Sequence, residues 1–535
     1  MKLQHILAAV VLFTVPQELD VAQVLPQGPE FQVNTHTTYS QTAPSVGVDG
    51  MGNFVVAWTS FGKDGSATGI AARRFDSAGA SLGAEFQVNT HTTSYQYSPA
   101  VAVDGVGNFV VVWTSNGKDG SGNGVSGQRF DSTGAPLGGE FVVNTYTTGN
   151  QVDASVAIDG MGDFVVVWSG DGQDGSLSGI FGQRFDSAGM PLGGEFQVNT
   201  FTTSLQQVPS VAMHASGSFV VAWTTFSEDL SGTGVFAQRY DSGGMPLGGE
   251  FQVNTYATGY QFEPAVAVDG SGNFVVAWTS DGEDGSGDGI FARRFDSAGA
   301  PLSDGFRVNA YTTSDQAQPA VAADASGSFV VAWTSYRQDG SGNGVLTRLF
   351  DRTGSPVGGE FQVNTYTTLG QYLPSVGLDG SGGAVVAWSS SQQDGSDAGV
   401  FGQRYCADFD GDGLCAGQDI FVTSPHAGDA VDCSNPTVTR PAFLWDAGNY
   451  EKFRVFIASD PSFAGGSRVA SGDRLLTSTT YTPPPKKWKS ACKKALAANP
   501  VSPVLYIKVQ GVDVDLTKND ANRKTFSQVV RVSAQ

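Results

Sequence analysis

Histidine, cysteine and long apolar segments are scarce in this chain of 535 residues. The five histidines form no H-E-x-x-H pattern and no Ser/His/Asp spacing, so neither a zinc site nor a nucleophilic triad is indicated. Beyond the N-terminus, no segment reaches the roughly 20 apolar residues that a membrane-spanning helix needs. The 70 glycines show no G-X-Y period, which excludes collagen and indicates many turns. This composition is typical of an all-β protein.

Basic residues are also few over the first three quarters of the chain. Residues 1–405 contain 15 Lys and Arg against 38 Asp and Glu, a net charge of −23, whereas residues 406–535 contain 15 against 13, a net charge of +2. The acidic part repels phosphate groups, so we expect no nucleic-acid partner.

The first 22 residues resemble a secretory signal peptide. They contain Lys2, an apolar run at residues 6–15 that is too short to span a bilayer, and the small residue Ala22 before the expected cleavage. Asp20 is unusual so close to a cleavage site. We therefore expect a secreted or cell-surface protein without a transmembrane segment.

All four cysteines lie in the last quarter of the chain. An even number of cysteines in an exported protein indicates two disulfides, for which three pairings are open. The pairing we favour joins Cys406 to Cys415 and Cys433 to Cys492.

Most of the chain is a repeat with a period of 55 residues. A fixed period of this order indicates a solenoid, a propeller or an array. Each unit contains an (E/G)F-x-V-N motif and a V-V-x-W motif. The phenylalanines of the first motif are Phe31, Phe86, Phe141, Phe196, Phe251, Phe306 and Phe361, and the tryptophans of the second are Trp58, Trp113, Trp168, Trp223, Trp278, Trp333 and Trp388.

Each unit contains four strand-like runs separated by Gly, Asp, Ser and Pro. In the fifth unit these runs are 264–268, 273–278, 289–295 and 306–309. The DGSGN turn between the first two has the residues that tight hairpins require. The second run is apolar throughout, so both of its faces must be buried.

Four antiparallel strands with covered central strands are typical of a β-propeller blade. The chain starts with a lone fourth-strand motif at residues 31–34 and the repeats end on a third strand at residues 399–405. The N-terminal strand can therefore complete the last blade and remove an exposed sheet edge. The sequence predicts a seven-bladed β-propeller over residues 23–405, closed by an N-terminal strand.

The motifs PAVAVDGSGNFVVAWTS and GIFARRFDSAG are similar to the tandem repeats of exported bacterial surface proteins. More distantly, they resemble the blades of sialidase-type and integrin-type propellers. The resemblance covers residues 31–405 and implies the fold, but not the function, because such propellers include both binding modules and unrelated enzymes.

Residues that recur seven times around a ring cannot together form one catalytic site. We interpret Trp278 and its equivalents as packing residues between blades. Arg294 and its equivalents, replaced by Leu349 in the sixth unit, are interpreted as partners in ion pairs. His214, at a position occupied by Asp in the other units, is interpreted as a turn residue.

The loop between the second and third strands and the loop leading to the next blade must emerge on the same face. Aromatic rings, glutamines and aspartates on that face suit stacking and hydrogen bonding to neutral sugars, and repetition would add avidity. The alternative is that each glutamine only ties down its own loop backbone. The candidate ligand-binding residues are Tyr146, Gln151, Tyr256, Gln261, Tyr311, Gln316, Tyr366 and Gln371.

A single calcium loop is predicted where the repeat stops. The stretch DFDGDGLCAGQD matches the D-x-D-x-D-G spacing of a twelve-residue loop, in which calcium would stiffen a linker at residues 406–420. It resembles dockerin and thrombospondin type 3 loops; the alternative is an acidic turn. The predicted ligands are Asp408, Asp410, Asp412, the Leu414 carbonyl and Asp419.

Residues 421–535 alternate polar and apolar residues as the strands of a small β-sandwich do. The run TRPAFLWDAGNYEKFRVFIASDPSF resembles fibronectin type III-like domains of exported bacterial proteins.

Three functional hypotheses follow. The first is a non-enzymatic binding or adhesion protein whose loop face meets carbohydrate or a cell-surface protein. The second is a hydrolase or lyase that acts on polysaccharide at the centre of the ring. It requires an asymmetric cluster of two carboxylates, or of a carboxylate with Tyr and Arg, contributed by different blades. The third is a structural surface scaffold.

Overall fold

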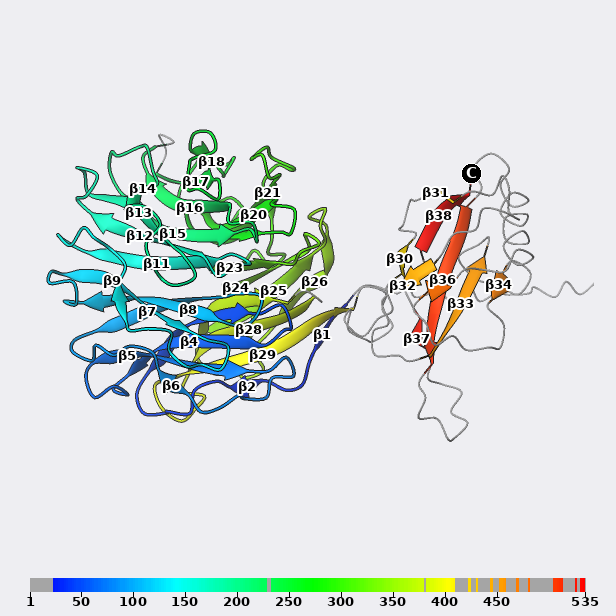
Figure 1. Cartoon of the computed structure of the whole chain (residues 1–535), viewed down its shortest axis with the longest axis horizontal. Helices are drawn as coiled ribbons and strands as arrows, with labels where there is room; N and C mark the ends of the chain where they lie inside the picture. Colours follow the sequence, from blue (N-terminus) through cyan, green and yellow to red (C-terminus); the bar gives the residue numbers. More distant parts are fainter. Residues whose placement is uncertain are drawn as a thin grey trace, which may run out of the picture. The chain divides into compact units, whose positions relative to one another are not determined.

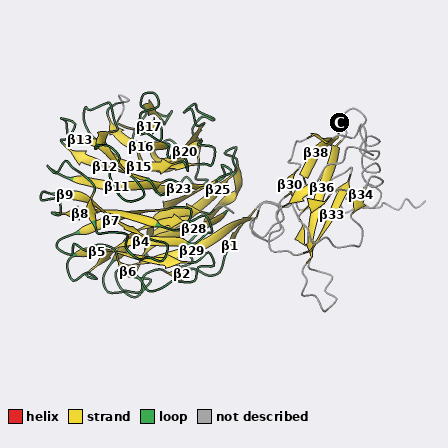
Figure 2. Cartoon of the chain, viewed as in Figure 1, coloured by secondary structure: helices red, strands yellow, loops and turns green. Residues whose placement is uncertain are grey.

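The computed structural model describes residues 23–228, 232–379 and 382–408, together with nine short strands between Val422 and Ala534. Every regular element in these residues is a strand (Figure 2). None of the described residues forms a helix long and apolar enough to cross a membrane. The chain divides into two compact units, one essentially residues 24–407 and the other mainly residues 419–535.

The larger unit is a seven-bladed β-propeller, as predicted (Figure 1). Blades 1 to 6 are antiparallel four-stranded sheets whose strands pair in sequence order. The inner strands are β3 (Gln41–Val48), β7 (Gln96–Val103), β11 (Gln151–Ile158), β15 (Gln206–Met213), β19 (Gln261–Val268), β23 (Gln316–Ala323) and β27 (Gln371–Leu378). The second strands are β4 (Phe54–Phe61), β8 (Phe109–Asn116), β12 (Phe164–Asp171), β16 (Phe219–Phe226), β20 (Phe274–Asp281), β24 (Phe329–Tyr336) and β28 (Gly383–Ser391).

The outer half of each blade is a long third strand and a short fourth one. The third strands are β5 (Thr68–Phe75), β9 (Asn123–Phe130), β13 (Ser178–Phe185), β17 (Thr233–Tyr240), β21 (Asp288–Phe295), β25 (Asn343–Phe350) and β29 (Ala398–Asp408). The outer strands are β6 (Phe86–Gln87), β10 (Phe141–Val142), β14 (Phe196–Gln197), β18 (Phe251–Gln252), β22 (Phe306–Arg307) and β26 (Pro356–Gln362).

The N-terminal segment closes the ring. Strand β2 (Phe31–Gln32) pairs antiparallel with β29 in the register that outer strands have elsewhere, with Phe31 opposite Gly402. Strand β1 (Gln23–Pro26) pairs with the same neighbour. The inner strands of consecutive blades lie side by side all around the ring, including β27 and β3. The predicted closure is therefore confirmed, and it satisfies what would otherwise be an exposed sheet edge.

The core lies between the blades. All seven repeated tryptophans are at most 1% exposed, which confirms their packing role. Blades 1 to 6 also stack the phenylalanine that opens the second strand on the aromatic residue that ends the third, as Phe274 does on Phe295 with 4.9 Å between ring centroids; blade 7 has Ala384 in place of the phenylalanine. Burial of such aromatic rings is the main source of stability in this architecture.

The repeated arginines bind main-chain carbonyls, so their interpretation as ion-pair partners is wrong. Arg294 donates to the carbonyl oxygens of Thr353 and Arg352 in the next blade, and Arg404 donates across the closure to Ala78. In blades 1 to 5 the acceptor lies 58 or 59 residues after the arginine. In blade 6 Leu349 occupies the arginine position, and the corresponding acceptors would be residues 407 and 408. The repeat has ended there, which explains why the arginine is missing.

The smaller unit is described only as strands. They are β30 (Val422–Ser424), β31 (Ala430–Val431), β32 (Phe443–Trp445), β33 (Lys452–Ala458), β34 (Arg468–Ala470), β35 (Thr480–Tyr481), β36 (Val504–Val512), β37 (Thr525–Phe526) and β38 (Val530–Ala534). They form one three-stranded and one six-stranded sheet. The prediction of a fibronectin type III-like sandwich depends on residues outside the described ones and stays a prediction.

The predicted signal peptide, disulfides and calcium loop also fall largely outside the described residues. Asp408 ends strand β29, but only its backbone is described. The other four calcium ligands and three of the four cysteines are not described. These features therefore stay predictions.

Candidate binding site at the propeller axis

One face of the propeller carries both kinds of long loop, as expected, and we call it the loop face. The loop between the second and third strands touches the loop that leads to the next blade. Asn89 Nδ2, for example, donates to Asp64 Oδ2 at 3.2 Å and to the carbonyl of His91 at 2.9 Å. The opposite face, which carries the connections from first to second and from third to outer strand, is called the hairpin face.

The four predicted ligand-binding glutamines are structural, so that part of the prediction is wrong. All four are fully buried. Gln151 shows their arrangement: its Nε2 donates to the carbonyl of Thr148 at 3.1 Å, and its Oε1 accepts from Asn144 Nδ2 at 3.2 Å. Each glutamine thus ties down its own loop backbone. The same arrangement holds for Gln261, Gln316 and Gln371.

The rings of the four predicted tyrosines remain partly accessible on the loop face. Tyr146 and Tyr311 are half-buried, and their backbone N–H groups donate to Glu195 and Glu360. Tyr256 and Tyr366 are half-buried in the same way. Contact between these rings and a ligand is not tested by the structure and stays a prediction.

A feature of the inner strands was missed by the sequence analysis. Each inner strand has a β-bulge near its start, and the third residue of every one has a positive φ between 51° and 59°. A non-glycine residue in this left-handed region costs about 1–2 kcal/mol. Such bulges re-aim side chains, frequently beside functional sites. The seven bulge residues are Ala43, Ser98, Asp153, Val208, Glu263, Gln318 and Leu373.

Hydrogen bonds between blades hold these bulges in place. The N–H of Ser98 donates to Thr59 Oγ1 of the preceding blade at 3.0 Å, and that of Val208 donates to Ser169 Oγ at 3.1 Å. Because each inner strand follows directly on a loop of the loop face, the bulges form a ring around the axis at that face.

The bulge ring is where the repeat loses its symmetry. In each blade, we call the bulge residue and the residue before it the bulge pair. The residue before this pair is glutamine in every blade, and the residue after it is proline in six of seven. The pair of residues between them is different in every blade. The pairs are Thr42–Ala43, Tyr97–Ser98, Val152–Asp153, Gln207–Val208, Phe262–Glu263, Ala317–Gln318 and Tyr372–Leu373. This variable pair within a constant frame was the signal by which the sequence could have revealed the site.

Two carboxylates from different blades lie in the bulge ring. Asp153 is open to solvent at the axis, but protein surrounds the rest of its side chain, and this desolvation raises the pKa of the carboxyl. Burial also raises the pKa of Glu263, whose Oε2 accepts from the backbone N–H of Gln318 at 3.2 Å. Burial, and then the charge of Asp153, raise the pKa of Tyr97.

Further acids surround the side of the ring formed by blades 5 and 6. Burial and the charges of Asp315, Asp281, Glu263 and Asp284 raise the pKa of Asp288 to about 6. Within the residues the structure describes, no group of three or more His, Cys, Asp or Glu side chains has a geometry suited to a metal ion. The bulge pairs contain no Lys or Arg. This surface therefore disfavours anionic ligands.

Neither a protein-family model nor a curated protein matches the chain. Among solved structures, a protein of unknown function from Dyadobacter fermentans is 12% identical, with a TM-score of 0.42 over 71% of this chain and 98% of its own. The α-L-arabinanase of Penicillium chrysogenum, complexed with arabinobiose, is 12% identical, with a TM-score of 0.42 over 70% of this chain and 98% of its own. The β-propeller domain of the Trilobed protease from Pyrococcus furiosus is 10% identical, with a TM-score of 0.41 over 71% and 98%. No conclusion about function follows from these similarities.

Proposed function

We propose that the propeller is an exported carbohydrate-binding protein that holds a neutral saccharide at the centre of its loop face. The supporting observation is the bulge ring: the frame repeats in all seven blades, while the two side chains that it presents at the axis differ in each. Structural positions repeat here because each blade makes the same contacts, so variation of both bulge-pair positions within a repeated frame favours one asymmetric ligand site.

The side chains of the bulge ring suit a sugar. Tyr97, Phe262 and Tyr372 supply aromatic surface for the apolar face of a pyranose ring. Asp153 and Gln318 supply carboxylate and amide groups that can orient hydroxyls. The surrounding acids favour a neutral ligand over an anionic one. The half-buried loop tyrosines, such as Tyr256, would add outlying contacts that increase avidity for a long chain.

Binding of a glycan array by the full chain tests this proposal. For the saccharide bound best, calorimetry should show that Y97A and F262A each weaken binding about tenfold or more, because stacking on an aromatic ring is lost. Y256A, which removes one of several equivalent loop tyrosines, should weaken it several-fold less. Equal effects of Y97A and Y256A would favour the loops over the axis, and an array without signal would leave a scaffold or protein-adhesion role.

Hydrolysis of a polysaccharide at the same place is the second candidate. It is favoured by the raised pKa of both Asp153 and Glu263, since a general acid must be protonated near the working pH. Release of reducing ends from the bound saccharide, abolished by D153N or E263Q without loss of binding, would identify an enzyme. Binding without release identifies a binding protein.

We also propose that calcium occupies the loop at residues 408–419 and stiffens the linker between the two units. The support is the D-x-D-x-D-G spacing of the sequence. Calorimetric titration of the full chain with calcium should show one site that is lost in the D410N/D412N double variant. An unchanged titration would mean that these residues form an acidic turn.

A further inference from the structure

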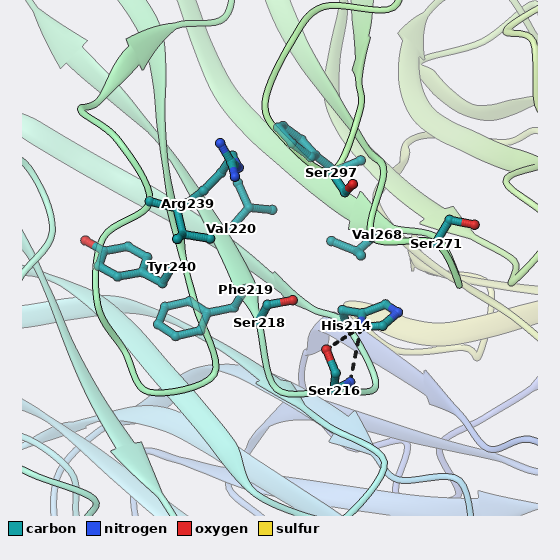
Figure 3. A pocket seen from close by; sticks show the side chains of 13 residues that line it. His214, Ser216, Ser218, Phe219, Val220, Arg239, Tyr240, Val268, Ser271 and Ser297 are labelled. Atoms are coloured by element: carbon teal, nitrogen blue, oxygen red, sulfur yellow. Dashed lines mark hydrogen bonds between the residues drawn. The ribbon is translucent and has the colours of Figure 1, made fainter.

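A second pocket, unrelated to the bulge ring, opens on the hairpin face between blades 4 and 5 (Figure 3). Its volume is about 220 Å³. A cavity of about 150 Å³ holds a benzene ring, so this pocket has room for one six-membered ring with its substituents. Its lining residues include no Asp or Glu, although the whole chain has a net charge of −21.

The same scaffold forms a matching pocket between blades 1 and 2, with a volume of about 230 Å³. The two pockets share the arginine of the third strand, the stacked aromatic pair and a leucine near the rim. They differ in the side chains that give the lining its chemistry. In the pocket between blades 4 and 5, His214 replaces Asp49 of the matching pocket, Ser216 replaces Met51, Ser218 replaces Asn53 and Ser271 replaces Val106.

The replacement of Asp by His214 changes the charge beside the arginine. In blade 5, Arg294 lies near both Asp351 of the next blade and Asp269 of its own hairpin, and both favour its charged form. Arg239 has His214 in place of the second carboxylate. The Nδ1 of His214 lies 2.7 Å from Ser216 Oγ (Figure 3). Its Nε2 lies 3.1 Å from the carbonyl oxygen of Gly270 in blade 5.

The replacement of Asn by Ser218 removes hydrogen bonds from the pocket lining. Blades 1, 2 and 5 have an asparagine at this position, which joins the hairpin to the turn after the third strand. In blade 1, Asn53 Nδ2 donates to Asp49, and Asn53 Oδ1 accepts from Ser77 N–H at 3.1 Å. A serine is too short to make both contacts. Among the described residues, the hydroxyl of Ser218 has no such partner in blade 4, so it faces the pocket (Figure 3).

Arg239 keeps hydrogen-bonding capacity for a ligand. Arg129, Arg184 and Arg294 each use both terminal nitrogens on carbonyls of the next blade. For Arg239, as for Arg74 and Arg404, the described contacts include one such bond, here from Nη1 to Ala298. A guanidinium with one terminal nitrogen left for a ligand, beside neutral hydroxyls and with one of its two neighbouring carboxylates replaced by His214, is suited to a carboxylate ligand.

Apolar residues also line the pocket. Phe219 and Tyr240 stack with 4.7 Å between their ring centroids, Val220 lies opposite Arg239 in the strand pairing, and Val268 and Leu247 add further apolar surface. Apolar side chains, serine hydroxyls and one cation in the same lining together match a sugar ring that carries a carboxylate.

We infer that the pocket between blades 4 and 5 is a binding site for a uronate, that is, a single acidic sugar residue whose carboxylate pairs with Arg239. The site lies on the hairpin face and does not depend on the saccharide site proposed at the axis.

Calorimetry or saturation-transfer NMR of the full chain with D-glucuronate tests this inference. Saturable binding is expected, with D-glucose weaker by about tenfold or more because it lacks the charged group that Arg239 binds. Inorganic sulfate should compete only weakly. Absence of glucuronate binding, equal binding of glucose, or sulfate binding as tight as that of glucuronate would each overturn the inference.

Two variants use residues that the repeat itself supplies, so they should fold. H214D/S218N restores the acidic lining of the other blades, and R239L copies the leucine of blade 6; each should weaken glucuronate binding about tenfold or more. R74L makes the same change in the matching pocket of blades 1 and 2 and should leave binding unchanged. Thermal unfolding confirms that all three variants are folded. Undiminished binding by H214D/S218N, or equal losses in R74L and R239L, would contradict the assignment.

Discussion

Closure of the ring by the N-terminal segment can be tested with one matched pair of substitutions. Asn34 and Asn199 occupy the same position of the repeat, and each is 2% exposed. Asn34 Oδ1 accepts from Val400 N–H at 2.8 Å across 366 residues of sequence, and Asn199 Oδ1 accepts from Ile180 N–H at 2.7 Å across 19. The contacts are equal in geometry, but only the first depends on closure.

The expected cost follows from these contacts. Replacing either asparagine by alanine leaves a buried backbone N–H without a partner, which costs about 1–3 kcal/mol. It also removes two hydrogen bonds donated by Nδ2, each contributing about 0.5–1.5 kcal/mol. For Asn34 these go to His36 and Asp394. N34A and N199A should therefore each lower the free energy of unfolding by roughly 2–6 kcal/mol.

Urea denaturation measures the two losses, and amide hydrogen exchange locates them. N34A should speed exchange at Val400 while leaving Ile180 unchanged, and N199A should do the reverse. If the N-terminal segment were detached in solution, N34A would have the stability of the unsubstituted protein while N199A would not. That result would refute ring closure.

Three further predictions concern the loop face. The pKa of Asp288 is raised from 3.8 to about 6, so the stability of the folded protein falls as the pH rises through that interval. D288N removes this carboxyl group. It should therefore raise the Tm above about pH 7 and leave it unchanged below about pH 3.5. In blades 3 and 6 a glutamine donates to a glutamate at the positions of Glu283 and Gly305. The double variant G305E/E283Q restores this pair and should raise the free energy of unfolding by about 1 kcal/mol, measured by urea denaturation. G305E alone should give a smaller gain, because Glu283 then faces a second carboxylate. Q151A should lower the Tm and leave saccharide affinity unchanged, since Gln151 is fully buried; weaker binding at unchanged Tm would contradict its structural role.

The fold was predictable because its determinants are local and repeated. The 55-residue period, the apolar second strand around Trp278 and the Asp-Gly turns each indicate one element without knowledge of any other. Even the closure followed from the sequence, because a lone fourth-strand motif at Phe31 and a missing fourth strand after Tyr405 complement each other.

The candidate sites were less predictable, because burial and hydrogen-bond partners depend on neighbouring blades. Gln151 and Asp153 are both polar residues at the start of an inner strand, and no sequence pattern states that the first is fully buried while the second is open at the axis. The bulge begins after Val152, and the positive φ of Asp153 itself turns the chain at that position.

The sequence by itself determined the number of blades, the strand order within each blade and the strand that closes the ring, because these depend on periodic burial and turn chemistry along the chain. Only the tertiary structure decided what each polar residue of the repeat does. Arg239 has its acceptor 59 residues away in the next blade, and His214 shares a pocket with Ser271 of another blade. Contacts of this kind arise when blades pack together, so their chemistry appears only once the ring is complete.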